Sequence, residues 1–142
     1  MFLQIWDARQ RYTQLIFMST VLVVEDSRTQ REMISELLRR SGLNVTAVSD
    51  GIEALQEVQG HCPDIVVLDI ILPRMNGYEV CRRLKSDKKI QKPPIIMCSR
   101  KSERFDLYWA LKQGADAYLD KPFRPEELVE TVKYLLRESS HS

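Results

Sequence analysis

Three things are scarce in this chain of 142 residues: cysteine, long apolar runs and an excess of charge of either sign. The three cysteines, Cys62, Cys81 and Cys98, form no CxxC pair and no metal-binding spacing, which favours reduced structural thiols. No apolar run approaches the ~20 residues of a membrane span. The N-terminus lacks the basic and apolar regions of a signal peptide. We therefore expect a cytoplasmic protein without membrane insertion.

The charges nearly cancel, with 21 basic and 20 acidic residues giving a formal net charge of +1. Nothing in this balance favours nucleic acid as a partner. The length is that of one folded domain with a sizeable core. Residues 1–17 precede the first apolar run and are either an added helix or a tail. We expect a single domain over residues 18–142.

Short apolar runs alternate with amphipathic segments along the rest of the chain. Apolar runs rich in Val and Ile are typical of buried parallel strands. The expected strands are Thr20–Glu25, Leu43–Val48, Asp64–Leu68, Ile95–Cys98 and Ala117–Leu119. The expected helices are Ser27–Ser41, Asp50–Val58, Tyr78–Lys85, Ser102–Gln113 and Pro125 to about Arg137. Five such units predict an α/β fold, a doubly wound parallel sheet with helices on both faces.

The first helix after a strand has its own start and stop signals. Ser27 and Gln30 have the spacing of a capping box, in which each residue bonds the other's backbone. Gly42 is placed to end the helix. The apolar residues at helical spacing, which we expect to form the buried stripe, are Met33, Ile34, Leu37 and Leu38.

Chemically active residues follow the apolar runs. Glu25 and Asp26 end the first run, Asp69 the third and Ser99 the fourth, and Lys121 follows the fifth. The carboxyl ends of parallel strands share one edge, where ligands bind. Three carboxylates there repel one another, and a hard cation such as Mg²⁺ relieves the repulsion. Asp69 is a candidate nucleophile for a phosphoryl group that Lys121 neutralises and Ser99 contacts.

The order of these motifs resembles the receiver domain of two-component response regulators, the CheY-like family. The matching elements are Glu25-Asp26, Asp69 followed by Pro73 and Met75-Asn76-Gly77, Ser99, and Lys121-Pro122-Phe123. The resemblance covers about residues 20–138. It implies a flavodoxin-like fold with sheet order 2-1-3-4-5.

The resemblance also implies a role for each residue. Asp69 is the phosphoacceptor, served by a sensor histidine kinase or a histidine phosphotransfer protein. Mg²⁺ or Mn²⁺ is held by Glu25, Asp26, Asp69 and the backbone carbonyl of Ile71. Ser99 and Lys121 contact the phosphoryl group, and Tyr118 is the aromatic switch. The protein is then a signalling protein rather than an enzyme, apart from magnesium-dependent self-phosphorylation and dephosphorylation.

The output is expected to be protein–protein interaction, because the printed chain ends near its last helix and leaves no room for a DNA-binding domain. The helix 102–113 has one apolar stripe containing Tyr108 and Trp109 and an opposed one containing Leu107, Ala110 and Leu111. By the resemblance, Leu107 and Leu111 beside Tyr118 form the signalling surface for a downstream target. A homodimer through helix 102–113, strand 117–119 and the last helix is a further option.

A finer resemblance concerns the stretch from Tyr108 to Tyr118, which is similar to stand-alone receivers of twitching-motility and type IV pilus systems. It implies a role in motility or phototaxis.

Two alternatives stay open: a scaffold that is not phosphorylated, and an aspartate-nucleophile phosphatase. Such a phosphatase usually carries an acid two residues after its nucleophile, where this chain has Ile71. Ile71 and Lys101 are expected to make the phosphoryl group long-lived.

Overall fold

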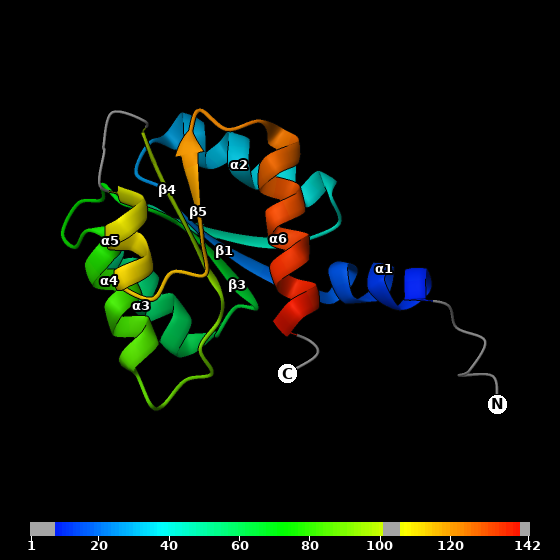
Figure 1. Ribbon diagram of the computed structural model, residues 1–142, viewed down its shortest axis with the longest axis horizontal. Helices are drawn as coiled ribbons and strands as arrows, with labels where there is room; N and C mark the ends of the chain where they lie inside the picture. Colours follow the sequence, from blue (N-terminus) through cyan, green and yellow to red (C-terminus); the bar gives the residue numbers. More distant parts are fainter. Residues whose placement is uncertain (1–7, 101–105, 140–142) are drawn as a thin grey trace.

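Five parallel strands pair in the order β2-β1-β3-β4-β5 in the computed structural model, which describes residues 8–100 and 106–139 (Figure 1). The strands are β1 Thr20–Val24, β2 Asn44–Val48, β3 Ile65–Asp69, β4 Ile95–Arg100 and β5 Ala117–Lys121. Every neighbouring pair is parallel. The predicted flavodoxin-like sheet order is confirmed, and each predicted strand is present within a few residues of its predicted bounds.

Helices cover both faces of this sheet. They are α1 Ala8–Met18, α2 Arg28–Arg40, α3 Gly51–Gly60, α4 Gly77–Ser86, α5 Asp106–Lys112 and α6 Pro125–Ser139. α3, α4 and α5 pack on one face, and α2 and α6 pack on the other, with α1 beside the end of α6 (Figure 1). No helix in the described part of the chain is both long and apolar enough to cross a membrane.

The period-two alternation of each central strand divides the core into two apolar layers. Leu22 and Val24 of β1 face α3, α4 and α5, whereas Val21 and Val23 face α2 and α6. β3 and β4 alternate in the same way. Because both faces of these strands are buried, the strands appear in the sequence as continuous apolar runs rather than alternating ones.

Residues 8–18 are helical, which is one of the two alternatives expected for the N-terminal segment. Ile16 of α1 is buried in the same apolar layer as α2 and α6. The Arg137 guanidinium of α6 lies 5.4 Å from the centre of the Tyr12 ring. Whether the domain folds without this segment stays a prediction, and the contacts of Ile16 indicate how the segment is attached.

One expectation about a buried face is wrong, and the exposure expected for Leu107 and Leu111 is found. Met33 is 58% exposed rather than part of the buried stripe, because it lies on the first half of α2 beside an open cavity. On α5, Leu107, Tyr108, Trp109 and Leu111 are all exposed, and only Ala110 is buried among the residues described there. α5 contacts the sheet at its edge, beside β5, and therefore buries one small residue instead of a stripe. The expected helical residues 102–105 lie outside the described part.

Candidate functional site

A cavity of about 230 Å³ opens at the carboxyl edge of the sheet. It contains every residue that the sequence placed at the reactive centre. Its lining consists of Glu25, Asp26, Ser27, Gln30, Asp69, Ile71, Ser99, Arg100 and Lys121. The parallel register brings these residues together because β1, β3, β4 and β5 all end at this edge.

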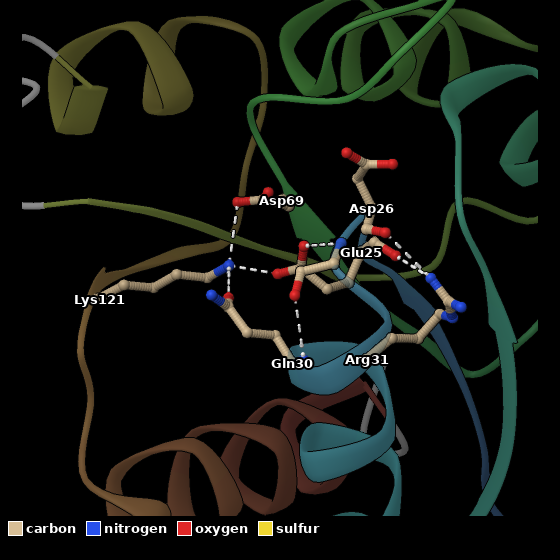
Figure 2. A network of polar contacts seen from close by, with 7 residues as sticks. Glu25, Asp26, Gln30, Arg31, Asp69 and Lys121 are labelled. Atoms are coloured by element: carbon tan, nitrogen blue, oxygen red, sulfur yellow. Dashed lines mark hydrogen bonds and ion pairs between the residues drawn. The ribbon is translucent and has the colours of Figure 1, made fainter.

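Lys121 lies at the centre of the polar contacts (Figure 2). Its Nζ is 3.3 Å from Asp69 Oδ1 and donates a hydrogen bond of 2.8 Å to Gln30 Oε1. It also forms an ion pair with Glu25 Oε1. The lysine side chain is only 13% exposed. A buried ammonium surrounded by oxygen acceptors is held in a defined position, unlike a solvated surface lysine.

The two adjacent acids of the first strand end differ in their environment. Glu25 is 3% exposed, and its second carboxylate oxygen accepts a hydrogen bond of 3.0 Å from the Ser27 backbone N–H. Asp26 is exposed, and its carboxylate points away from Lys121 (Figure 2). Arg31 donates to the backbone carbonyls of both acids, at 2.9 and 3.2 Å, and so fixes the chain between them. Glu25 therefore serves as an internal partner of Lys121, whereas Asp26 is open to a ligand.

Burial is the largest influence on the nucleophile candidate: it raises the pKa of Asp69 to about 6, assisted by the charge of Glu25 and opposed by Lys121. For Lys121, burial lowers the pKa, but the hydrogen bond that Lys121 donates to Glu25 and the charges of Asp69 and Glu25 raise it by more. At neutral pH the site therefore holds an ionised lysine beside an aspartate that is mostly ionised.

Ser99 provides a second observation that points to a ligand. The residue is 2% exposed, and its hydroxyl is one of two buried side-chain oxygens or nitrogens in the described residues that have no hydrogen-bond partner. It lies on β4, between β3 with Asp69 and β5 with Lys121, and lines the same cavity. A buried hydroxyl without a partner costs stability unless a bound group supplies one. A phosphoryl oxygen on Asp69 is a suitable acceptor.

The oxygen donors suit a small hard cation in part. Asp26, Asp69 and Ile71 line the cavity, which offers two carboxylates and a backbone carbonyl. Mg²⁺ prefers such a set completed by water and a phosphate oxygen. Over residues 8–100 and 106–139, no three His, Cys, Asp or Glu side chains are grouped to hold a metal by themselves. The carboxylate of Glu25 already accepts from Lys121 and Ser27.

The loop after β3 is held against the nucleophile by the turn Met75-Asn76-Gly77. Asn76 caps α4 by accepting a 3.0 Å hydrogen bond from the Glu79 backbone N–H. The Gly77 N–H donates to the Ile70 carbonyl at 2.7 Å. A Cβ on Gly77 would lie 2.3 Å from the Asp69 carbonyl oxygen, so only glycine fits this close approach. The Lys121–Pro122 bond on the other side of the site is cis.

Three other predicted residues, Tyr118, Leu107 and Leu111, do not line the cavity. Tyr118 is half-buried and packs on the α3, α4 and α5 side of the sheet. Leu107 and Leu111 are exposed on α5, near β5. Lys101 lies outside the described residues.

Sequence reasoning missed two residues at the site, Gln30 and Arg31. Gln30 was interpreted as half of a capping box, and Ser27 Oγ does accept from the Gln30 backbone N–H at 3.3 Å. The Gln30 side chain, however, reaches Lys121 instead of the start of its own helix. Arg31 gave no signal beyond a polar position five residues after Asp26. The contact of Gln30 joins residues 91 positions apart, which local spacing does not encode.

Comparison with known proteins identifies a matching family and several relatives. Residues 21–133 match the family model described as the response regulator receiver domain. Over 117 residues the chain is 42% identical to the DNA-binding response regulator MtrA of Mycobacterium tuberculosis (strain ATCC 25618 / H37Rv), covering 82% of this chain and 50% of MtrA. The chain thus spans about half the length of this relative.

A second relative is matched over most of its own length. Protein PilG of Pseudomonas aeruginosa is 37% identical over 113 residues, which are 80% of this chain and 84% of PilG. Among solved structures, the chemotaxis response regulator CheY4 of Vibrio cholerae superimposes with a TM-score of 0.76 at 31% identity, covering 83% of this chain and 98% of that one.

Proposed function

This chain belongs to the response regulator receiver family, and we propose that it signals by accepting a phosphoryl group on Asp69. The observation that carries the proposal is one constellation: Lys121 Nζ lies 3.3 Å from Asp69 Oδ1, and the buried Ser99 hydroxyl on the intervening strand has no partner. The site thus offers a nucleophile, a cation and a hydrogen-bond donor to one ligand. The donor of the phosphoryl group is a sensor histidine kinase or a histidine phosphotransfer protein.

The proposed transfer is a displacement at phosphorus. An Asp69 carboxylate oxygen forms a bond to the phosphorus of a phosphohistidine, the phosphorus–nitrogen bond breaks, and the leaving imidazole nitrogen takes up a proton. With its pKa raised to about 6, Asp69 is mostly ionised at neutral pH and remains a competent nucleophile. Lys121 neutralises charge on the transferred group, and Ser99 donates to one of its oxygens.

We propose Asp26, Asp69 and the Ile71 carbonyl as the residues that hold Mg²⁺ or Mn²⁺, all three lining the cavity. Glu25 assists them through its charge and through its bonds to Lys121 and Ser27. A cation held by these residues would offset the negative charge on the oxygens of the phosphoryl group. Asp26 supplies a carboxylate that forms no ion pair with a lysine or arginine in the part of the chain that the structure describes, and it is therefore available to a metal.

The direct test is labelling with acetyl phosphate in the presence of Mg²⁺. Wild-type protein should incorporate phosphate, Asp69→Asn should incorporate none, and Asp26→Asn should be slowed strongly. Chelation of the metal by EDTA should stop labelling of the wild type. Equal labelling with and without EDTA would show that no metal is required. Undiminished labelling of Asp69→Asn would show that Asp69 is not the phosphoacceptor.

The two alternatives find less support. A phosphatase using Asp69 needs an acid to protonate its leaving group, and the position two residues on is Ile71, which is apolar and 60% exposed. A scaffold that is never phosphorylated gives no reason to keep a hydroxyl buried without a partner beside a buried ion pair. Ile71 offers no side chain to position an attacking water, so we expect slow loss of the phosphoryl group.

For the output we propose a protein partner at the exposed part of α5 together with Tyr118. Leu107 and Leu111 are both exposed on this helix, and Tyr118 lies half-buried on the neighbouring strand. Phosphorylation adds about −1.5 to −2 charge at Asp69, which draws Ser99 and Lys121 toward it. Movement of Ser99 then gives Tyr118 space to turn inward. The same surface would serve a homodimer.

Replacing Leu107 and Leu111 together by Ser tests this surface, with Leu15→Ser on α1 as a control at the other end of the molecule. The α5 variant should fold, accept phosphate normally and lose phosphate-dependent binding to its target or to itself. Normal target binding by the α5 variant would show that the interaction surface lies elsewhere on the protein. Motility or phototaxis is the pathway that we propose to examine first, on the resemblance of the stretch from Tyr108 to Tyr118.

A further inference from the structure

The side chain of Gln30 is diverted from the local role that its position favours. In a capping box, the residue at this position reaches back to the backbone N–H of the N-cap residue. Here the Ser27 N–H donates instead to Glu25 Oε2, at 3.0 Å. The Gln30 side chain is therefore not needed to cap its own helix, and its amide oxygen accepts a 2.8 Å hydrogen bond from Lys121 Nζ (Figure 2).

This bond completes the surroundings of the Lys121 ammonium group. A lysine ammonium carries three protons and no acceptor, and it has three oxygen partners here: Glu25, Asp69 and Gln30. The three partners come from β1, β3 and α2, so they hold the nitrogen from three elements of the fold. Of these three partners only Gln30 is neutral, so it adds an acceptor without adding a further negative charge beside the nucleophile.

Gln30 also lies between two cavities. One is the site cavity, and the other is a neighbouring cavity of about 390 Å³ whose lining includes Met33, Ile34, Pro122 and Phe123. Without the amide, one ammonium proton would face these apolar side chains with no acceptor. The nitrogen would then be free to shift toward Glu25, its other carboxylate partner, and away from Asp69.

We propose that Gln30 is a positioning residue that holds Lys121 in place to meet the phosphoryl group on Asp69. The inference rests on the proposed function of Asp69. Gln30 acts through Lys121 and does not itself touch the nucleophile. Removing its acceptor should therefore slow phosphoryl transfer by about fivefold, the factor that corresponds to one orienting hydrogen bond.

A double-mutant cycle separates this role from a structural one. Phosphorylation from acetyl phosphate with Mg²⁺ is measured for the wild type, Gln30→Met, Lys121→Met and the double variant, with Met33→Ala as a control on the same cavity. Gln30→Met should slow transfer about fivefold when Lys121 is present and should have no further effect in the Lys121→Met background. Met33→Ala should leave the rate unchanged. Equal slowing in both backgrounds, no slowing in either, or equal slowing by Met33→Ala would overturn the proposal.

A second measurement does not require phosphorylation, so the two proposals can fail separately. Exchange of the Lys121 ammonium protons with water is followed by nitrogen-15 NMR in the protein without phosphodonor. Gln30→Met should speed this exchange several-fold, and Met33→Ala should not. Unchanged exchange in Gln30→Met would overturn the role of Gln30, whereas faster exchange in a protein that takes no label at Asp69 would overturn the proposed function alone.

Discussion

The two ends of the sheet bury different kinds of groups. At the carboxyl end, a carboxylate, an ammonium and an unpartnered hydroxyl are buried together in Glu25, Lys121 and Ser99. At the amino end, the buried groups are mostly apolar, and exposed polar groups pair across the chain. The buried apolar side chains at this end include Ile16, Leu38, Leu43 and Leu136. Among the exposed polar groups, the Thr20 backbone N–H donates a hydrogen bond of 2.8 Å to the Asp64 carboxylate.

This difference separates the part of the molecule that stabilises the fold from the part that performs chemistry. Apolar burial at the amino end contributes about 25 cal/mol for each Å² removed from water. Burial of charged groups and of an unpaired hydroxyl at the carboxyl end opposes folding until a bound ligand supplies the missing partners. Substitution of a buried apolar side chain at the amino end should therefore lower stability and leave phosphorylation unchanged. Replacement of Asp69 at the carboxyl end should abolish phosphorylation and raise the stability of the metal-free protein.

The largest expected effect on stability comes from the amino end. Leu38 is fully buried on α2, and Leu38→Ala should lower the free energy of unfolding by about 3 kcal/mol through lost burial and a cavity. Met33→Ala on the same helix is the control and should stay within about 0.5 kcal/mol, because Met33 is largely exposed. Urea unfolding measures both. Phosphorylation of the folded Leu38→Ala protein should be unchanged, and a loss of it would mean that the two ends are coupled.

Gly77→Ala should disturb both properties, because the added Cβ would meet backbone atoms of Asp69 and Ile70 at 2.3 and 2.8 Å. Backbone atoms cannot move aside cheaply, so we expect a loss of about 2 kcal/mol in stability. Slower phosphorylation should accompany it. Gly60→Ala is the matched control, since no atom lies within 4 Å of its added Cβ. A normal phosphorylation rate in Gly77→Ala would show that the backbone of Asp69 tolerates displacement.

Asp69→Asn should instead stabilise the metal-free protein. The pKa of Asp69 is raised from 3.8 to about 6, chiefly by burial, so the folded state binds its proton more tightly than the unfolded state. The protonated Asp69 carboxyl therefore makes its full contribution to the free energy of unfolding below pH 4, and this contribution is lost as the pH rises through 6. In EDTA at pH 8 the variant should therefore be more stable by about 2 kcal/mol, and the gain should shrink toward pH 4. Equal stability at pH 8 would show that Asp69 carries no burial penalty.

The smallest expected effect is removal of residues 1–17. Ile16 is buried against the α2 and α6 layer, and Tyr12 lies against Arg137, so their loss should cost about 1 kcal/mol and a few degrees of melting temperature. Differential scanning calorimetry of a protein starting at Met18 measures this. Loss of cooperative melting would mean that the segment is an integral part of the core.

The sequence predicted the sheet and the reactive residues because each is encoded locally. Asp69, Ser99 and Lys121 stand at the ends of short apolar runs, and parallel strands bring such ends to one edge. Gln30 was not predictable, because its partner is 91 residues away and its spacing to Ser27 indicates a cap. The buried side of α5 was not predictable either, because its place at the sheet edge, rather than its periodicity, decides what it covers.

The central claim is that Asp69 receives the phosphoryl group, and locating the phosphate tests it most directly. Protein treated with acetyl phosphate and Mg²⁺ is reduced with borohydride, which converts an aspartyl phosphate to homoserine, and the product is sequenced by mass spectrometry. The account predicts homoserine at position 69 in wild-type protein and at no position in Asp69→Asn. Homoserine at another aspartate in the wild type, or none after stoichiometric labelling, would contradict it.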